Sequence, residues 1–534
     1  MRRDESLAAM RTAPLDLLVV GGGIAGAGIA LEAARTGARV ALAEARDYAS
    51  GASSRSSKLV HGGLRYIAQG QFGLTRESVR ERDALLRDAA GLVQPLRFLL
   101  PVHSHDRNGR LKLGLGLALY DRFAGRRTRR WHGAAELLMQ APALDARGLQ
   151  GGWSYLDAQT DDARLVLRLL AEARRAGAIT LNHLKVESLL RGEGGAGVGG
   201  AVLHDIAGGE RFVLPARCVI SATGAWADEL RGGLGRPRAL RPLRGSHLLF
   251  AAWRFPLAQA VAFFHPHDGR PVFALPWEGG TLAGTTDLDH RTDLGQEPAI
   301  SADELDYLLA GLASCFPSLG LAARDVLSTW SGVRPVVASG RDVDPSAETR
   351  EQLVLQEDGL ITVTGGKLTT FRATAWQALR IAATRVPALN ALRTEAPVVS
   401  PLEDAVQQSL RALPPALRSR WLARFGNDAG QVLACMRDDR ELQPVAGTDV
   451  AWAELRWACR GEDALHLDDL LLRRTRLGLL LRDGGAALLP RLQPLLQQEL
   501  GWDEARWRDE CTRYGALIAR CYAVPGRRVP AEMA

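Results

Sequence analysis

The sequence predicts an α/β fold in which a dinucleotide-binding domain is interrupted by an antiparallel-sheet domain and followed by an all-helical domain. Three observations lead to this prediction. Residues 15–44 have the pattern strand, glycine turn, helix, strand. Residues 240–325 change to short alternating segments, which are typical of antiparallel strands. Beyond about residue 395 strand patterns nearly vanish, and helical patterns continue to about residue 522.

The first segment, LDLLVVGGGIAGAGIALEAARTGARVALAE, sets the topology. It is long and apolar, but the glycines in its first half argue against a membrane span. We expect a buried strand at Leu15–Val20, a helix at about Ile24–Thr36 that stops at Gly37, and a second buried strand at Arg39–Glu44. These elements make a βαβ unit.

The strand, turn and helix pattern returns further along the chain. Predicted helices cover residues 75–87 and 161–178, and predicted strands lie at residues 179–181 and near residue 213. Residues 218–230 and 360–383 again have the order strand, small-residue turn, helix. The recurrence indicates that one parallel sheet is assembled from distant segments.

Composition sets limits on the function. The 534 residues, 46% of them hydrophobic, suffice for several cores. The six cysteines include no CxxC pair, which argues against a zinc site and a disulfide framework and favours a reducing compartment. The N-terminus MRRDESLAAMRTAP lacks the apolar core of a secretory signal. A net charge of +7 fits nucleic acid, an anionic membrane or anionic substrates equally well.

The glycine turn has the spacing of a dinucleotide-binding motif. Gly21, Gly23 and Gly26 form G-x-G-x-x-G between strand and helix, and Glu44 ends the next strand, where a carboxylate can accept ribose hydroxyls. Glycine lets a pyrophosphate approach the backbone, and the helix N-terminus supplies free N–H groups. This motif fits NAD and FAD equally.

Later glycine turns favour FAD. A large flavin needs several chain segments around it, and Gly365 and Gly366 precede a helix whose first turn can direct N–H groups at the flavin ring. Thr223 and Gly224 can approach the cofactor in a similar way.

Nine segments, in order from residue 19 to residue 478, carry a resemblance to a known family. They are VVGGGIAGAGIA, SSRSSKLVHGGLRYI, DDARLV, SATGAW, RGSHLLF, GTTD, SGVRP, GGKLTTFR and LLLRRTRLG. The chain resembles the FAD-dependent glycerol-3-phosphate dehydrogenases of the D-amino-acid-oxidase-like superfamily. The resemblance implies oxidation of sn-glycerol 3-phosphate to dihydroxyacetone phosphate by hydride transfer from C2 to flavin N5, with electrons passed to membrane quinone.

The resemblance also implies a Rossmann-like FAD-binding domain interrupted by an antiparallel-sheet substrate domain and followed by a C-terminal helical cap domain. Within residues 15–390, we assign about 15–75, 155–235 and 326–390 to FAD binding, and about 76–154 and 236–325 to substrate binding. Residues 395–525 form the helical domain.

Site residues follow from the same motifs. Cofactor-binding residues implied are Gly21, Gly23, Ile24, Gly26, Glu44, Ser56, Ser57, Lys58, Leu59, Gly62, Gly63, Val186, Thr223, Gly224, Gly366, Lys367, Leu368 and Thr369. Substrate-binding residues implied are Arg65, Tyr66, Thr286, Asp287, Arg350 and Lys367. Arginine offers a bidentate fork to a phosphate dianion, and a tyrosine hydroxyl adds a further donor.

Oxidation of a secondary alcohol needs a base for the hydroxyl proton. His247 in RGSH is our first choice and His61 the second, although a lone histidine is more often structural. Arg334 in SGVRP resembles the arginine that neutralises the substrate near the reacting carbon. Lys58 and Lys367 are two of only four lysines, which suggests that a compact ammonium serves the flavin-facing segments.

Two segments leave alternatives open. Residues 110–131 combine apolar residues with arginines, and they form either a surface for anionic lipid headgroups or a buried helix with a basic exit loop. The LLLRRTRLG segment either closes over the pocket or packs as a basic helix. His265 and His267 form an HxH that we interpret as a loop, and no metal site is expected.

The expected location is the cytoplasm, at the inner face of the membrane, with the oligomeric state open and a homodimer included. Three rival functions remain. A glycerol-3-phosphate oxidase would use the same site with O2 as acceptor, and a flavin amine or amino-acid oxidase would need a carboxylate pocket. A basic nucleic-acid-binding or flavin-sensing protein would show salt-sensitive polynucleotide binding; we expect no nucleic acid as partner.

Overall fold

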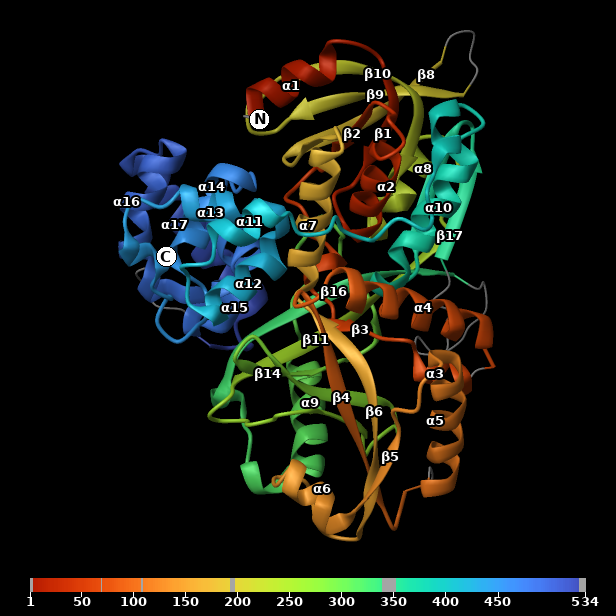
Figure 1. Ribbon diagram of the computed structural model, residues 1–534, viewed down its shortest axis with the longest axis vertical. Coiled ribbons are helices and arrows are strands. Elements are labelled where there is room, and N and C mark those ends of the chain that lie inside the picture. Colours follow the sequence, from red (N-terminus) through yellow and green to blue (C-terminus); the bar gives the residue numbers. More distant parts are fainter. Residues whose placement is uncertain (1–2, 69, 107–108, 193–196, 339–351, 528–534) are drawn as a thin grey trace.

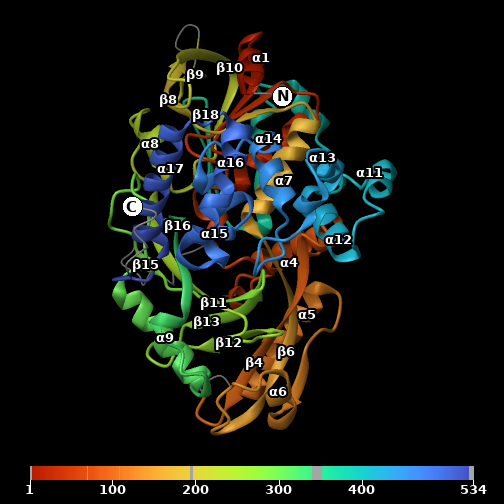
Figure 2. The same ribbon diagram turned by 90° about the vertical axis from the view of Figure 1, so that its left-hand side faces the viewer.

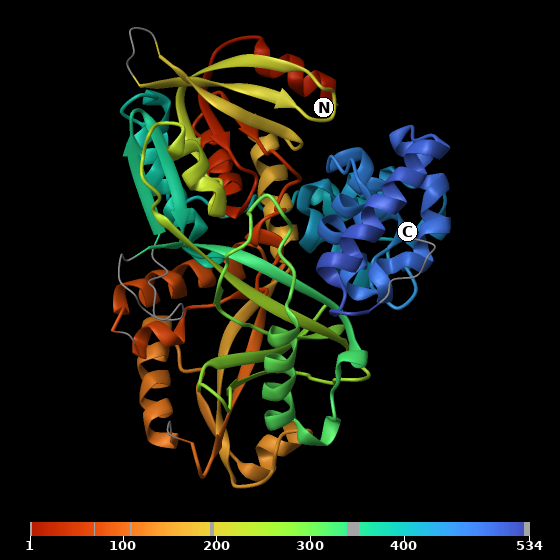
Figure 3. The ribbon, with the colours of Figure 1, turned by 180° about the vertical axis from the view of Figure 1, so that it is seen from behind.

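The computed structural model describes residues 3–68, 70–106, 109–192, 197–338 and 352–527, and these form three parts (Figure 1). A first sheet with its helices makes the upper part, a second sheet makes the lower part, and the C-terminal helices, in blue, lie to one side. Figure 3 shows the same parts from behind, with the green helix α9 (Ala302–Cys315) in front of the second sheet. The predicted fold class is confirmed.

Five strands of the first sheet run parallel in the order β18, β10, β1, β2, β7. Their bounds are β1 Leu15–Val20, β2 Val40–Ala43, β7 Ile179–Leu181, β10 Arg211–Ser221 and β18 Leu360–Gly365. β17 (Gln352–Glu357) pairs antiparallel with β18, and β8 (Leu184–Arg191) and β9 (Val198–Asp205) form an antiparallel ribbon beside β10. The apolar, almost fully buried β1 is typical of a parallel strand covered on both faces.

Helices cover one face of this sheet, and the ribbon covers the other. The helices are α2 (Ile24–Ala34), α7 (Asp162–Arg175) and α10 (Phe371–Ala382). Leu17 and Val19 of β1 join their apolar core, whereas Leu18 packs with the β8–β9 ribbon and with α1 (Arg3–Arg11). The predicted βαβ unit is therefore confirmed, with α2 ending two residues earlier than expected.

In the part of the chain that the structure describes, the second sheet has ten strands. They are β3 (Leu59–Val60), β4 (Val93–His103), β5 (Arg130–Gly133), β6 (Leu149–Thr160), β11 (Leu240–Ala251), β12 (Ala260–Phe264), β13 (Pro271–Trp277), β14 (Gly280–Gly284), β15 (Leu288–Asp289) and β16 (Val326–Val337). Helices α3 (Leu64–Ala68), α4 (Phe72–Asp88), α5 (Arg110–Ala124) and α6 (Ala134–Gln140) accompany it. Its pairings are antiparallel except that of β12 with β4.

Two expected domain boundaries need correction. We placed residues from 326 onward in the FAD-binding part, but β16 pairs with β11 in the second sheet from Val326 opposite Phe250 to Val337 opposite Leu240. β16 covers the edge of β11 that β14 leaves unpaired, so its backbone groups are bonded in the second sheet. Likewise β6 runs through the boundary expected at residue 155.

The pairing of β11 with β16 fixes which side chains share a face. Directly opposed residues of antiparallel strands project to the same side. His247 opposes Trp330, and Gly245 opposes Gly332, so these lie on one face. Ser246, between them, projects to the opposite face, where α9 packs.

Beyond residue 395 the described chain is helical, as predicted. The helices are α11 (Asp404–Ser409), α12 (Pro415–Phe425), α13 (Ala429–Ala434), α14 (Trp452–Gly461), α15 (Leu477–Leu480), α16 (Leu489–Leu500) and α17 (Glu504–Leu517). A π-helical turn, η11 (Asp469–Arg474), precedes α15, and another, η13 (Ile518–Tyr522), follows α17. Figure 2 shows these helices, in blue, in front of the place where the two sheets meet. Among the described residues, every helix is too short or too polar to cross a membrane.

Candidate active site

Four parallel strands of the first sheet end at the same edge. Val20 of β1 lies opposite Ala43 of β2 and Ser221 of β10, and Ser221 lies opposite Thr362 of β18. The residues that follow these strand ends are partly exposed although the strands are buried: Gly23, Ile24, Glu44, Thr223, Gly224, Gly365, Gly366, Lys367 and Leu368. In open α/β sheets ligands bind at the carboxyl edge. All nine come from the predicted cofactor segments.

The glycines at this edge leave room for a dinucleotide. Gly21 has φ +108°, and a Cβ there would lie 2.6 Å from the carbonyl oxygen of Ala222. A Cβ at Gly26 would lie 1.9 Å from the carbonyl oxygen of Gly21, so α2 packs tightly against the turn. At Gly224, by contrast, a Cβ would meet no described atom within 4 Å, which indicates open space beside the turn.

Glu44 is held in place by the turn. Its carboxylate accepts N–H groups from Gly22 at 2.6 Å and Arg46 at 2.8 Å. Burial raises the pKa of Glu44 above its usual 4.5, against the lowering effect of these two bonds. The side chain remains partly exposed and keeps lone pairs for further donors. The glycine turn, the open end of α2 and this carboxylate fit an FAD pyrophosphate and ribose.

Residues Arg55–Lys58, here called the serine loop, cross the second sheet beside this edge. A Cβ at Gly332 would lie 2.8 Å from the carbonyl oxygen of Arg55, so glycine is needed where the loop passes over β16. The indole of Trp330 donates to the carbonyl of Ser56 at 3.4 Å. One residue further, the hydroxyl of Ser57 lies 2.8 Å from Nε2 of His247. The loop thus joins the two sheets.

His247 is nearly inaccessible, at 1% exposure. Its ring stacks on Trp330 with 5.4 Å between the ring centroids. Burial, and then the positive charges of Arg334 and Lys58, hold the pKa of His247 well below 6.5, so the ring is neutral at neutral pH. The partly exposed Ser57 therefore separates the predicted base from the surface.

The prediction for Lys58 is wrong for its side chain. The ammonium is fully buried and donates to the carbonyl of Ser54 at 2.6 Å and to the carboxylate of Asp162 at 2.8 and 2.9 Å. Burial lowers its pKa to about 8, against the raising effect of Asp162. The group serves an internal ion pair and is not accessible from the surface. Leu59 follows it on β3 and is buried as well.

The HGG turn connects two predicted motifs. The N–H of Gly62 donates to the hydroxyl of Tyr120 at 2.9 Å and to Asp157 at 3.1 Å. The N–H of His61 donates to the hydroxyl of Thr369 at 3.2 Å. Thr369 is buried, and its hydroxyl is bonded to this turn; His61 itself is partly exposed.

Tyr66 and Lys367, both predicted to bind substrate, lie next to each other. The ammonium of Lys367 lies 4.2 Å from the centroid of the Tyr66 ring and also donates to Ser78. A Cβ at Gly63, which has φ +78°, would lie 2.1 Å from this ring, so glycine is required there. Arg65 belongs to α3, but its side chain is outside the described structure, and Arg350 lies outside the described residues.

Arg334 projects over Gly245 on the face that carries His247. Its guanidinium donates to Asp287 at 3.2 Å and to the hydroxyl of Thr285 at 3.2 Å. A Cβ at Gly245 would lie 2.4 Å from the same guanidinium. Arg270 is a second partner of Asp287, at 3.4 Å. Asp287 therefore orients Arg334, whose side chain is 23% exposed.

Thr286, predicted to bind substrate, projects to the other side. Its hydroxyl donates to Glu304 of α9 at 2.7 Å and accepts the N–H of Ser246 at 2.9 Å, and the residue is 3% exposed. The neighbouring Thr285 is the partly exposed one beside Arg334. Thr285 and Gly245 were not among the site residues predicted from the sequence. The alternation of side chains along a strand could have indicated them, because it places every second residue of RGSH and GTTD on the same face.

Val186 lies on β8, at the far end of the cofactor edge. Two residues earlier, the N–H of Leu184 donates to the carbonyl of Glu44 at 2.8 Å. The Val186 side chain is buried with Val20 and Ala43, directly behind the glycine turn and Glu44.

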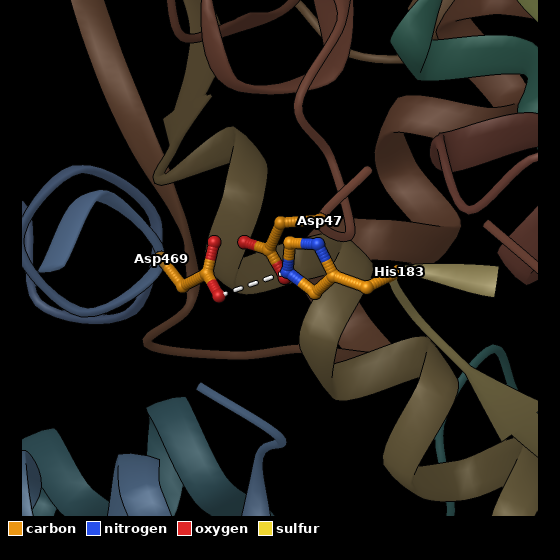
Figure 4. Close-up of side chains that lie close together, drawn as sticks. All are labelled: Asp47, His183 and Asp469. Carbon is orange, nitrogen blue, oxygen red and sulfur yellow. Dashed lines mark hydrogen bonds and ion pairs between the residues drawn. The ribbon is translucent and has the colours of Figure 1, made fainter. Parts of the chain in front are cut away.

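One cluster resembles a metal site but is an ion-pair network. Asp47, His183 and Asp469 lie together between the first sheet and the C-terminal helices (Figure 4). Arg473 donates to both carboxylates, and Arg474 donates to Asp47 at 2.6 and 2.7 Å. Guanidinium groups thus supply the positive charge. In the predicted HxH loop, the buried His265 uses both ring nitrogens within the protein.

The chain matches two family models. One, described as FAD dependent oxidoreductase, covers residues 16–380, and the other, described as the C-terminal domain of alpha-glycerophosphate oxidase, covers residues 373–507. Two proteins named aerobic glycerol-3-phosphate dehydrogenase are similar in sequence. That of Staphylococcus epidermidis is 37% identical over 74% of this chain and 72% of its own, and that of Bacillus subtilis is 39% identical over 70% and 68%.

Solved structures give the same picture. A glycerol-3-phosphate dehydrogenase from Bacillus halodurans, complexed with FAD, has a TM-score of 0.79 and 29% identity, and the match covers 99% of both chains. An L-alpha-glycerophosphate oxidase from Mycoplasma pneumoniae with FAD bound has a TM-score of 0.57 at 18% identity, over 73% of this chain and all of that one, and it shares the fold.

Proposed function

Since the chain belongs to the family of FAD-dependent oxidoreductases, we propose that it oxidises sn-glycerol 3-phosphate at C2 to dihydroxyacetone phosphate. Membership confirms the family resemblance in the sequence and makes FAD its cofactor. The observation that carries the proposal is the row formed by Ser57, His247, Thr285 and Arg334, beside the glycine edge that fits FAD. The names of the similar dehydrogenases support the choice of substrate.

Ser57 and His247 of this row can take up the hydroxyl proton of the substrate. When bound, FAD supplies the oxidising power for loss of hydrogen from C2. Ser57 accepts the substrate hydroxyl proton as it passes its own proton to Nε2 of His247, 2.8 Å away. The low pKa of His247 keeps the ring neutral and able to accept. Trp330, stacked on the ring, and the serine loop exclude water from this path.

Cationic groups can hold the phosphate. Arg334, oriented by Asp287, belongs to the row with Ser57 and His247, and Lys367 with Tyr66 lies near the HGG turn. Arg65 follows that turn on α3. We assign the phosphate to Lys367, Tyr66 and Arg65, with Arg350 as a predicted fourth group, and the alcohol carbon to Arg334.

We further propose membrane quinone as the acceptor, with the enzyme at the cytoplasmic face of the membrane. Support comes from α5, where Leu111 is 88% and Leu115 74% exposed, one helical turn apart. Of the arginines that follow, Arg126 pairs with Asp83, and Arg129 pairs with the buried Asp121. Replacing both leucines with glutamate should release the protein from sedimenting anionic vesicles; unchanged sedimentation would place the contact elsewhere.

A second candidate is a glycerophosphate oxidase with O2 as acceptor. The match of residues 373–507 to the C-terminal domain of alpha-glycerophosphate oxidase favours it. Amine and amino-acid oxidation have weaker support, since a glycine oxidase from Geobacillus kaustophilus shares the fold at 23% identity, with a TM-score of 0.55 over 72% of this chain and 96% of that one.

Product analysis separates these functions. The holoenzyme is incubated with sn-glycerol 3-phosphate, either anaerobically with a short-chain quinone or in air without quinone. Dihydroxyacetone phosphate formed with quinone, and little peroxide in air, is the expected result. Peroxide formed in air in the same amount as dihydroxyacetone phosphate would show that the enzyme is an oxidase. Turnover of glycine or proline, with none of the phosphate ester, would overturn the proposal.

A further inference from the structure

Two motifs that the proposed site does not use meet beneath the serine loop. DDARLV contains Asp161 and Asp162, where α7 begins, and LLLRRTRLG contains Arg476, between η11 and α15. Nε of Arg476 donates to Asp161 at 2.9 Å, and its other nitrogens reach Asp162 and, at 3.3 Å, the carbonyl of Ser54. Arg476 is 1% exposed. Of the two alternatives for this segment, packing as a basic helix agrees with the structure, because η11 and α15 are helical and Arg476 is buried.

Asp162 connects this arginine to the serine loop. Its fully buried carboxylate accepts the N–H of Ser56 at 3.0 Å, the hydroxyl of Ser56 at 2.7 Å and the ammonium of Lys58 at 2.8 Å. Three groups of the loop are thus bonded to one carboxylate, whose remaining partner from the C-terminal domain is Arg476. Ser57 lies between these two anchored residues.

The C-terminal domain holds the loop at a second point. Tyr522, in η13, accepts hydrogen bonds from the guanidinium of Arg55 at 3.2 and 3.3 Å. Arg55 is the first residue of the serine loop and is 5% exposed. The loop is therefore held by Tyr522 at Arg55, and by the Arg476–Asp162 pair at the two neighbours of Ser57.

We propose that Arg476, acting through Asp162, is a positioning residue for the active site, and that the C-terminal domain sets the place of Ser57. Without Arg476 the buried Asp162 keeps the ammonium of Lys58, but its charge is less fully compensated, and we expect its remaining donors to rearrange. Those donors are the loop itself. Displacing Ser57 by even 1 Å spoils a 2.8 Å hydrogen bond to His247.

The rival explanation is that Arg476 only docks the two domains. A matched control variant distinguishes positioning of the serine loop from docking of the two domains. Arg456 is another buried arginine of the C-terminal domain, but its partners Glu441 and Glu499 belong to the same domain, with 2.9 Å from Nε to Glu441. Arg456→Lys should weaken the domain without touching the serine loop.

The test compares Arg476→Lys and Arg476→Gln with Arg456→Lys in the holoenzyme. Hydrogen–deuterium exchange is followed in the peptide that covers residues 52–60, which includes the N–H groups of Ser56 and Lys58. We expect exchange of these amides to rise about 10-fold or more in Arg476→Gln, less in Arg476→Lys, and not in Arg456→Lys. If Arg476→Gln does not fold, Arg476→Lys alone carries the comparison. Exchange that is unchanged, or raised equally by the control, would overturn the proposal.

A kinetic arm rests on the proposed function. In Arg476→Lys, kcat with sn-glycerol 3-phosphate should fall about 10-fold with little change in KM, because Ser57 acts on the proton and not in binding. Equal loss of kcat in Arg456→Lys would mark a general loss of stability. Because the exchange measurement needs no substrate, it stands even if wild-type enzyme does not turn over this ester, and the two failures remain distinguishable.

Discussion

The hydroxyl of Ser57 lies 2.8 Å from Nε2 of His247, and only the serine is partly exposed. The two residues are 190 positions apart, one in the serine loop that leads into β3 and the other on β11. In the proposed reaction the substrate hydroxyl therefore meets the serine and not the histidine.

Ser57→Ala should slow single-turnover flavin reduction by roughly 10²-fold, and His247→Gln by a similar factor. The double variant should lose little more than either single variant, because both act on one proton. Stopped-flow absorbance measures the rates. His267→Gln, on an exposed loop, serves as the control. Fully additive losses would show that the two residues act separately.

Thr285 and Thr286 should behave oppositely on loss of their hydroxyls. Thr285→Val removes a partner of Arg334 and should raise KM several-fold with little loss of stability. Thr286→Val leaves the buried Glu304 without one donor and should lower the free energy of unfolding by about 1–3 kcal/mol. Kinetics and denaturant unfolding measure the two effects. A raised KM in Thr286→Val at unchanged stability would reverse their assignment.

Gly245→Ala should impair catalysis. The added Cβ would lie 2.4 Å from the Arg334 guanidinium and 2.6 Å from the Thr285 hydroxyl, so both must shift. We expect kcat/KM to fall about 10²-fold. Gly116→Ala, in the middle of α5 where a Cβ meets nothing within 4 Å, is the matched control and should gain up to about 1 kcal/mol. Equal activity of both variants would contradict the placement of Arg334.

The junction between the first sheet and the C-terminal domain should weaken as pH rises. The pKa of His183 is raised above 6.5. Burial and the positive charge of Arg473 lower this pKa, but the hydrogen bond to Asp469 and the nearby charge of Asp47 raise it by more. The ring also contacts His466, which pairs with Glu510. The folded state thus binds the proton more tightly, and this stability is present below about pH 6.5 and lost as pH rises through the folded pKa.

His183→Asn tests this dependence, because asparagine tolerates the positive φ of 49° at this position. The melting temperature of wild type should exceed that of the variant most at about pH 6 and least at about pH 9. A difference that stays constant with pH would show that His183 does not titrate in this range.

The local patterns predicted the first sheet well, since a glycine turn between a buried strand and a helix has few other structures. Single-residue roles were harder. Choosing between Thr285 and Thr286 depends on which of them lies on the face that carries His247, and that is set by the pairing of β14, which precedes them, with β11. The ammonium of Lys58 pairs with Asp162, and Asp162 in turn pairs with Arg476, which is 314 residues away in the chain. The helix and strand periodicity of a single sequence does not indicate which distant residues form such an ion pair.

The proposed oxidation of sn-glycerol 3-phosphate is tested most directly by mixing the oxidised holoenzyme with this ester in the absence of oxygen and following the flavin absorbance. We predict loss of the yellow colour at about one equivalent of ester per flavin, and its retention with glycerol, which lacks the phosphate. An unchanged spectrum with the phosphate ester, in protein that carries FAD, would contradict the proposal.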